Sequence, residues 1–244
     1  MSASPEDLEA VDPAASPLAR VAGVFGSPGP TFASIARRPG WVLPLAISTV
    51  LSIAATVAVL PRIDIDSAVR EQIASRGITL PEERIDQMIA LQKKLSGLIG
   101  YPSALLAPTL AALLVAAVFW ISFRAFGSDV AFRQSFGVTS HAMLPSIGTS
   151  MLLIFFVTGV DLVNPSDLGD LTRSNLGLLV DRRANPVLHS LARSMDVFTL
   201  WVLALLVIGF AAAAKASRRK AAGLVVGVWA LYVLGKAGWA AIFH

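Results

Sequence analysis

Two ionisable side chains lie within long apolar stretches of this sequence, where such groups are rare. His141 lies just inside the third of five apolar stretches, and Lys236 lies in the last third of the fifth. A titratable group at membrane depth is a candidate for a role in transport or proton transfer, so these two form a candidate intramembrane polar site. The structural alternative is that His141 bonds to nearby groups, while Lys236 extends toward the interface or pairs with Asp161 or Asp196.

Other patterns that would indicate catalysis or metal binding are absent from the sequence. Asp64-Ile65-Asp66 is a lone pair of carboxylates in a loop, and the three histidines have no ligand-like spacing. The sequence contains no HExxH, P-loop, GxSxG or glycine-rich dinucleotide motif. It also has no cysteine, which excludes disulfides, thiolate metal sites and cysteine nucleophiles. We therefore expect no catalytic residue, no cofactor and no metal, and a protein that is not an enzyme.

The elements that carry the two ionisable residues are long enough to cross a bilayer. A helix rises about 1.5 Å per residue, so about 20 apolar residues span a hydrocarbon core about 30 Å thick. Hydrophobic residues make up 55% of the 244 residues, charged residues only 15%, and the mean hydropathy is +0.68. The sequence predicts an all-α polytopic membrane protein, a bundle of five transmembrane helices with short interfacial helices. The predicted spans cover about residues 41–60, 102–126, 138–160, 197–214 and 221–243.

The N-terminal segment differs in composition from the rest of the chain. Residues 1–19 are rich in alanine, serine, proline and acidic residues, which is typical of a disordered segment. The segment lacks the basic and apolar regions of a cleavable signal peptide. We expect a disordered cytoplasmic N-terminus over residues 1–19 and a single membrane domain over residues 20–244.

Basic residues near the spans predict the orientation of the chain. Short loops rich in lysine and arginine remain in the cytoplasm, and four such residues lie between the last two spans: Lys215, Arg218, Arg219 and Lys220. The number of spans then places the N-terminus in the cytoplasm, the C-terminus outside, and the two long connections, 61–101 and 161–196, outside. The same four residues are candidates for binding lipid headgroups. The net charge of +4 is thus explained by a membrane, and we expect no nucleic acid as a partner.

Short helices are expected in the connections. Thr31 can cap a helix that runs through Arg38. Pro81-Glu82-Glu83 predicts a helix start in the first long connection, and Asn185-Pro186 predicts one in the second. We expect these helices to lie in the membrane interface.

Prolines and glycines mark positions where the spans could bend or approach one another. Pro108 and Pro145 each remove a hydrogen bond inside a predicted span and can kink it. Gly223 and Gly227 form a GxxxG motif, which permits close helix packing within the chain or between two copies.

Three stretches of the sequence resemble the Yip1-type membrane domain in its bacterial form. The first contains Phe132-Arg133-Gln134-Ser135 between two spans and continues to Pro145. The second runs from Asp196 through Trp201 to Gly209 and on to the basic loop at 215–221. The third is the early stretch that begins Phe25-Gly26-Ser27-Pro28 and ends Pro39-Gly40-Trp41. The resemblance covers about residues 20–240.

The resemblance implies mainly a topology, with five spans and a cytoplasmic N-terminus, and its bacterial form implies a bacterial inner membrane. A DLYGP-like signature of the eukaryotic members is absent, so their role with Rab GTPases is not implied. We hypothesise an adaptor or scaffold that organises the membrane or its partner proteins, with membrane lipids and other membrane proteins as partners. The alternative is a small transporter or channel component with a polar cavity near His141 and kinks at Pro108 and Pro145. A membrane enzyme would require polar groups from both external connections to converge.

Overall fold

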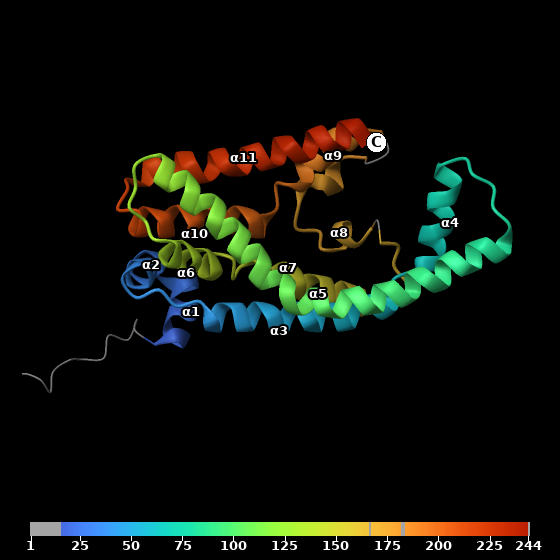
Figure 1. The fold of residues 1–244 in the computed structure, drawn as a ribbon, viewed down its shortest axis with the longest axis horizontal. Helices are drawn as coiled ribbons and strands as arrows, with labels where there is room; N and C mark the ends of the chain where they lie inside the picture. The colour runs from blue at the N-terminus through green and yellow to red at the C-terminus, as the bar shows by residue number, and fades with distance from the viewer. Residues whose placement is uncertain (1–15, 166, 182–183, 244) are drawn as a thin grey trace, which may run out of the picture. The chain divides into compact units, whose positions relative to one another are not determined.

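The protein is described by a computed structural model that covers residues 16–165, 167–181 and 184–243 (Figure 1). Apart from two isolated bridges, the regular structure in these ranges is helical, which confirms the all-α fold class. The disorder expected for residues 1–19 falls outside the described ranges, except at 16–19. There Ser16 caps the first helix by accepting a hydrogen bond from the Ala19 N–H at 3.1 Å.

Helices follow one another along the whole described chain. The α-helices are α1 (Pro17–Gly26), α2 (Pro28–Arg37), α3 (Val42–Val59), α4 (Ile65–Ser75), α5 (Glu82–Ala125), α6 (Phe132–Ala142), α7 (Ser146–Val157), α8 (Leu168–Leu171), α9 (Pro186–Arg193), α10 (Val197–Ala213) and α11 (Arg218–Phe243). Two short 3₁₀ helices cover Leu60–Arg62 and Leu176–Leu179.

Four helical segments are long and apolar enough to cross a membrane. They are Val42–Arg62, Glu82–Ala125, Phe132–Val157 and Arg218–Ile242. The segment expected at 197–214 forms α10, a shorter apolar helix of 17 residues. Its length is about 25 Å, at the lower limit for a spanning helix. The chain is therefore a helical protein with four long candidate spans and one shorter apolar helix.

Helix α5 joins two elements that the sequence predicted separately. The helix expected to start at Pro81 and the span expected at 102–126 form one continuous helix of 44 residues. Pro102 and Pro108 lie inside it. Proline lacks the N–H of the intrahelical bond, so α5 misses one such bond at each of these positions.

The third predicted span is divided into two helices. Helix α6 ends at Ala142, and α7 begins at Ser146 after a turn. Pro145 lies at the N-cap of α7, where its missing N–H costs no intrahelical bond. The structure thus places this proline between two helices instead of within one.

The chain divides into two compact units. Unit 1 comprises residues 1–46, 111–144 and 201–232, and unit 2 comprises 47–110, 145–200 and 233–244. In unit 1 the largest buried side chains include Phe32, Phe123 and Phe210, and the rings of Phe123 and Phe210 stack at 4.8 Å. In unit 2 a separate core joins α4 to the start of α5 through Ile65, Val69, Ile85 and Ile89.

Candidate functional site

In unit 1 the two N-terminal helices pack on α6. The Gln134 side chain donates from Nε2 to the Ala36 carbonyl at 2.9 Å and accepts from the Ala131 N–H at 2.9 Å. Gly137 faces Pro39 and Ile35 closely, since a Cβ built on this glycine would lie 3.2 and 3.4 Å from them.

The sequence suggested Thr31 as the cap of α2, and this prediction is wrong. Helix α2 begins earlier, at Pro28, and the Thr31 hydroxyl donates to the Ser27 carbonyl at 2.8 Å.

Polar side chains of α6 are buried and bond mainly to backbone carbonyls. Ser135 donates to the Ala116 carbonyl at 2.7 Å, and Ser140 donates to the Phe136 carbonyl at 2.7 Å. His141 is 2% exposed, and its Nδ1 donates to the Gly137 carbonyl at 2.8 Å. The Thr139 hydroxyl is buried and has no hydrogen-bond partner among the described residues. The structural alternative for His141 was a hydrogen bond to a nearby group. The bond to Gly137 fulfils it for Nδ1, and it leaves the other ring nitrogen, Nε2, unaccounted for.

The sequence analysis missed Arg20, which is 8% exposed. Its Nη1 donates to the Arg38 carbonyl at 2.7 Å and so ties α1 to the end of α2. Arg20 and His141 line the same cavity, which has a volume of about 210 Å³. A signal was present, because Arg20 interrupts an otherwise apolar stretch from Leu18 to Phe25.

The basic loop between α10 and α11 contacts the loop between α5 and α6. Lys220 Nζ donates to the Phe126 carbonyl at 2.8 Å, and Ser128 Oγ donates to the Ala214 carbonyl at 3.4 Å. Lys215, Arg218, Arg219 and Lys220 are all exposed. The same count of spans also places the loop between α5 and α6 in the cytoplasm, so the structure brings two connections of the predicted cytoplasmic side into contact.

Charge is distributed unequally between the two units. Beyond residue 15, unit 1 contains nine lysines and arginines but a single acidic residue, Asp129. Unit 2 contains eleven basic and eleven acidic residues. We call the exposed basic residues of unit 1 the basic surface; they are Arg37, Arg38, Arg124, Arg133, Lys215, Arg218, Arg219 and Lys220.

Lys236, Gly223 and Gly227 are the remaining predicted site residues. Lys236 belongs to unit 2, whereas His141 belongs to unit 1. Lys236 forms no ion pair within the described ranges. Its suggested partner Asp196 instead caps α10, accepting from the Phe198 and Thr199 N–H groups at 2.9 and 3.1 Å. Nothing in the described chain lies within 4 Å of a Cβ built on Gly223 or Gly227, so no part of it packs on the GxxxG motif.

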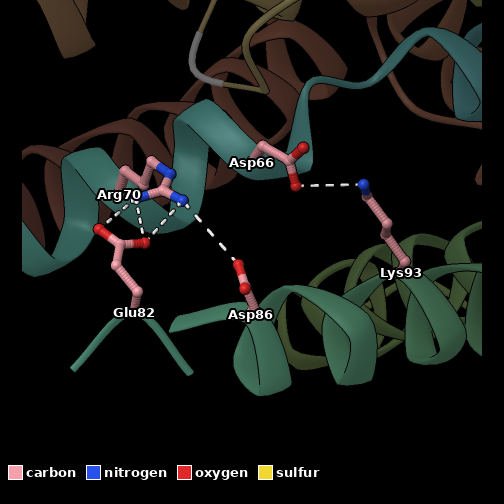
Figure 2. Close-up of polar contacts among 5 residues, drawn as sticks. All are labelled: Asp66, Arg70, Glu82, Asp86 and Lys93. Carbon is pink, nitrogen blue, oxygen red and sulfur yellow. Dashed lines mark hydrogen bonds and ion pairs between the residues drawn. The ribbon is translucent and has the colours of Figure 1, made fainter. Parts of the chain in front are cut away.

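Figure 2 shows the polar contacts that join α4 to the start of α5 in unit 2. Arg70 pairs with Glu82 at 3.1 Å and with Asp86 at 3.9 Å, and Lys93 pairs with Asp66 at 3.1 Å (Figure 2). One carboxylate of the Asp64-Ile65-Asp66 motif thus forms an ion pair.

The other carboxylate of that motif caps α4. The Asp64 side chain accepts from Ser67 Oγ at 2.5 Å and from the Ser67 N–H at 3.0 Å. These two bonds hold the pKa of the Asp64 carboxyl below its ordinary value. Each aspartate of the motif therefore has a structural role in the α4–α5 hairpin.

Comparison with known proteins identifies one family. The model of the Yip1 domain matches residues 22–240, which include His141, the basic surface, three of the four long candidate spans and nearly all of the fourth. The cavity residues Pro17 and Arg20 precede the matched range. Members of this family are generally non-enzymatic membrane proteins. No curated protein and no solved structure matches the chain.

Proposed function

We propose that this multi-pass membrane protein, which belongs to the Yip1 domain family, is a non-enzymatic organiser of the membrane. In this proposal its basic surface gathers anionic lipid headgroups, and the partner proteins that assemble on them, at one face of the membrane. The proposal rests on the unequal distribution of charge, with nine basic residues and one acidic residue in unit 1 beyond residue 15.

The basic surface suits anionic headgroups because its charges are exposed and close to apolar helices. A lysine or arginine near an anionic membrane surface contributes about 1 kcal/mol to the attraction. Arg124 follows the apolar part of α5 and lies with its guanidinium 6.0 Å from the Trp120 ring. The Arg133 guanidinium lies 5.5 Å from the ring centre of Trp41, the residue just before α3. Tryptophan prefers the headgroup level of a bilayer, so these two pairs support a position of the basic surface at the headgroups.

The proposed topology has five crossings, with the N-terminus in the cytoplasm of a bacterial cell and the C-terminus outside. The chain passes between the two units five times, after residues 46, 110, 144, 200 and 232. Every passage falls within one of the five apolar segments, α10 included. In unit 2 the connections proposed to be external also meet, because the Asp64 N–H donates to the Val163 carbonyl at 2.9 Å. The bond from Lys220 to the Phe126 carbonyl bears on α10, because it joins the loops before α6 and after α10. An even number of crossings then separates these loops, which supports α10 as a crossing helix after the crossing by α6 and α7.

The experiment compares the lipids that surround the protein in vesicles of mixed phosphatidylglycerol and phosphatidylcholine. A variant with Lys215, Arg218, Arg219 and Lys220 all changed to glutamine should lose most of the phosphatidylglycerol enrichment measured in extracted lipid–protein discs. The matched control changes Arg76, Arg84 and Lys94, exposed basic residues of unit 2, to glutamine and should retain the enrichment.

Salt provides a second readout, since exposed charges are screened within about 10 Å at 0.1 M salt. The enrichment should fall as salt is raised for the native protein and not for the four-residue variant. Equal enrichment in native protein, variant and control would refute the proposal.

A further inference from the structure

The cavity at Arg20 and His141 has the features of a binding site that is separate from the basic surface. Its volume of about 210 Å³ is smaller than the roughly 300 Å³ at which pockets for drug-sized ligands begin, so it suits a group of few atoms. Arg20 and His141 are its two ionisable lining residues. The remaining lining comes from Pro17, Gly40, Trp41 and the first residues of α3.

Arg20 supplies positive charge inside the cavity. The residue is 8% exposed, and the bond from Nη1 to the Arg38 carbonyl fixes the guanidinium in place. A guanidinium carries five N–H donors in a fork that matches phosphate and carboxylate oxygens. Hydrogen bonds from a guanidinium to an anion are charge-assisted, and a buried position strengthens them.

His141 supplies a hydrogen-bond acceptor in the same cavity. A carbonyl oxygen can only accept, so the bond to Gly137 places the hydrogen on Nδ1. In the neutral ring Nε2 is then an acceptor. Nε2 has no hydrogen-bond partner in the described part of the chain, although the residue is 98% buried and lines the cavity. A ligand that satisfies Nε2 must therefore bring a donor, such as a hydroxyl.

The start of α3 adds further donors. Val42, Leu43 and Pro44 are the first residues of α3, and all three line the cavity. The bond from the Leu45 N–H to the Trp41 carbonyl opens the helix, so the Val42 and Leu43 N–H groups precede the intrahelical bonds. The positive end of the helix dipole points the same way as these N–H groups. The cavity thus combines a buried cation, free backbone donors and one acceptor.

We propose that this cavity binds a phosphate ester that carries a free hydroxyl, the chemistry of a phosphoglycerol headgroup. The phosphate oxygens accept from Arg20 and from the start of α3, and the hydroxyl donates to His141 Nε2. The apolar lining at Trp41, Val42 and Leu43 contacts the carbon atoms of the ligand. The same chemistry occurs in a lipid and in a soluble glycerol phosphate, and the test separates these sources.

The test measures binding of short-chain lipids to the full-length protein in neutral detergent by native mass spectrometry. Phosphatidylglycerol should bind about tenfold or more tightly than phosphatidylmethanol, which has the same charge but no hydroxyl, because one buried hydrogen bond distinguishes them. His141→Leu should abolish this preference. Because the preference is a ratio within one variant, a general loss of stability does not change it.

Two further variants test the role of the Arg20 charge and the need for an empty cavity. Arg20→Gln should weaken binding of both lipids about tenfold or more, whereas Arg37→Gln, which removes an exposed charge from α2, should not. A Cβ on Gly40 lies 3.7 Å from Arg20 Nη1, so Gly40→Leu fits the backbone and fills the cavity. It should also abolish binding.

Soluble sn-glycerol 3-phosphate is the probe for the other source. If this compound displaces phosphatidylglycerol at similar concentration, the ligand of the cavity is a soluble glycerol phosphate. If it does not, the ligand is the lipid. Equal binding of the two lipids, or unchanged binding in Gly40→Leu, would overturn the proposal. Glutamine variants of the basic loop leave the preference between the two lipids unchanged, so this proposal and the proposed function fail separately.

Discussion

Gly209 in α10 lies directly against Phe32 in α2. A Cβ built on Gly209 would lie 2.9 Å from Phe32 Cδ1 and 2.5 Å from Val138 Cγ1, distances at which neighbouring groups must move. All three residues belong to unit 1, and both Phe32 and Val138 are fully buried. The absence of a side chain at one position of α10 is therefore what allows α2 and α6 to pack there.

Gly209→Ala should destabilise unit 1. Overpacking of a well-packed core costs about 1–3 kcal/mol, because side chains or backbone must shift to admit the extra carbon. The measurement is the thermal unfolding midpoint in detergent. Gly227→Ala is the control, since nothing described lies within 4 Å of a Cβ there, and it should not lower the midpoint, because alanine favours a helix more than glycine does. Equal effects of the two changes would contradict the packing seen at Gly209.

Thr139→Val should stabilise the protein. The Thr139 hydroxyl is fully buried and has no partner in the described residues, so the native state carries a polar group that lost its water without a replacement. Such a group costs about 1–3 kcal/mol, and valine removes it at nearly the same size. The unfolding midpoint should rise. Ser135→Ala is the opposite control: it removes the bond to the Ala116 carbonyl and should lower the midpoint.

The α4–α5 hairpin should depend only weakly on its ion pairs. Arg70 and Glu82 are 48% and 72% exposed, and exposed pairs contribute about 0.2–1 kcal/mol. Arg70→Gln should therefore speed hydrogen exchange in α4 only a few-fold, and added salt should produce the same effect in the native protein. Ile89→Ala removes a buried side chain from the core of the hairpin and should have the larger effect. A larger effect of Arg70→Gln than of Ile89→Ala would mean that charge, not apolar packing, holds the hairpin.

Acid should loosen the start of α4. Because Ser67 holds the pKa of the Asp64 carboxyl below its ordinary value of 3.8, ionised Asp64 stabilises the folded hairpin above that value. This contribution is lost as the pH falls below 3.8 and through the lower folded pKa. The Ser67 amide signal in an NMR titration should report the change. Asp64→Asn keeps a side-chain oxygen as N-cap but does not titrate, so this signal should then stay constant over the same range.

The lack of cysteine allows a direct test of topology, because a single introduced thiol is the only one present. Ser75→Cys in α4 should react with a membrane-impermeant maleimide added to intact cells. Ser217→Cys in the basic loop should react only after the membrane is opened. Both positions are exposed, so a difference in labelling reports the side of the membrane. Labelling of both from outside would mean that one of the three proposed crossings between them does not cross, and α10 is the shortest of the three.

The apolar stretches could be predicted from sequence because a bilayer requires about 20 consecutive apolar residues, a pattern that does not depend on tertiary packing. The predicted spans at 41–60 and 221–243 correspond closely to α3 and α11. The continuity of α5 could not be predicted in this way, because two prolines and a polar first half suggest two elements. In the structure the polar first half of α5 packs on α4, with the ion pair between Arg70 and Glu82 at the contact. This contact stabilises the polar half as a helix, so α5 is continuous.

The candidate site was only half predictable. His141 stood out as a histidine in an apolar stretch, but its closeness to Arg20 depends on how α1 packs, over a separation of more than a hundred residues. Burial of Ser135, Thr139 and Ser140 was equally hidden, because nothing in the local sequence says that the N-terminal helices cover this face of α6. Local patterns report which residues are unusual, and packing decides which of them meet.

Helix α5 contains 44 residues and is therefore about 66 Å long, twice the thickness of the hydrocarbon layer it enters. About 20 residues suffice to cross that layer, so the charged first half of α5 extends beyond the hydrocarbon. The missing bonds at Pro102 and Pro108 make the helix most compliant there. Motion of the α4–α5 hairpin would therefore be taken up at these two positions, and the apolar half of α5 beyond them would move less.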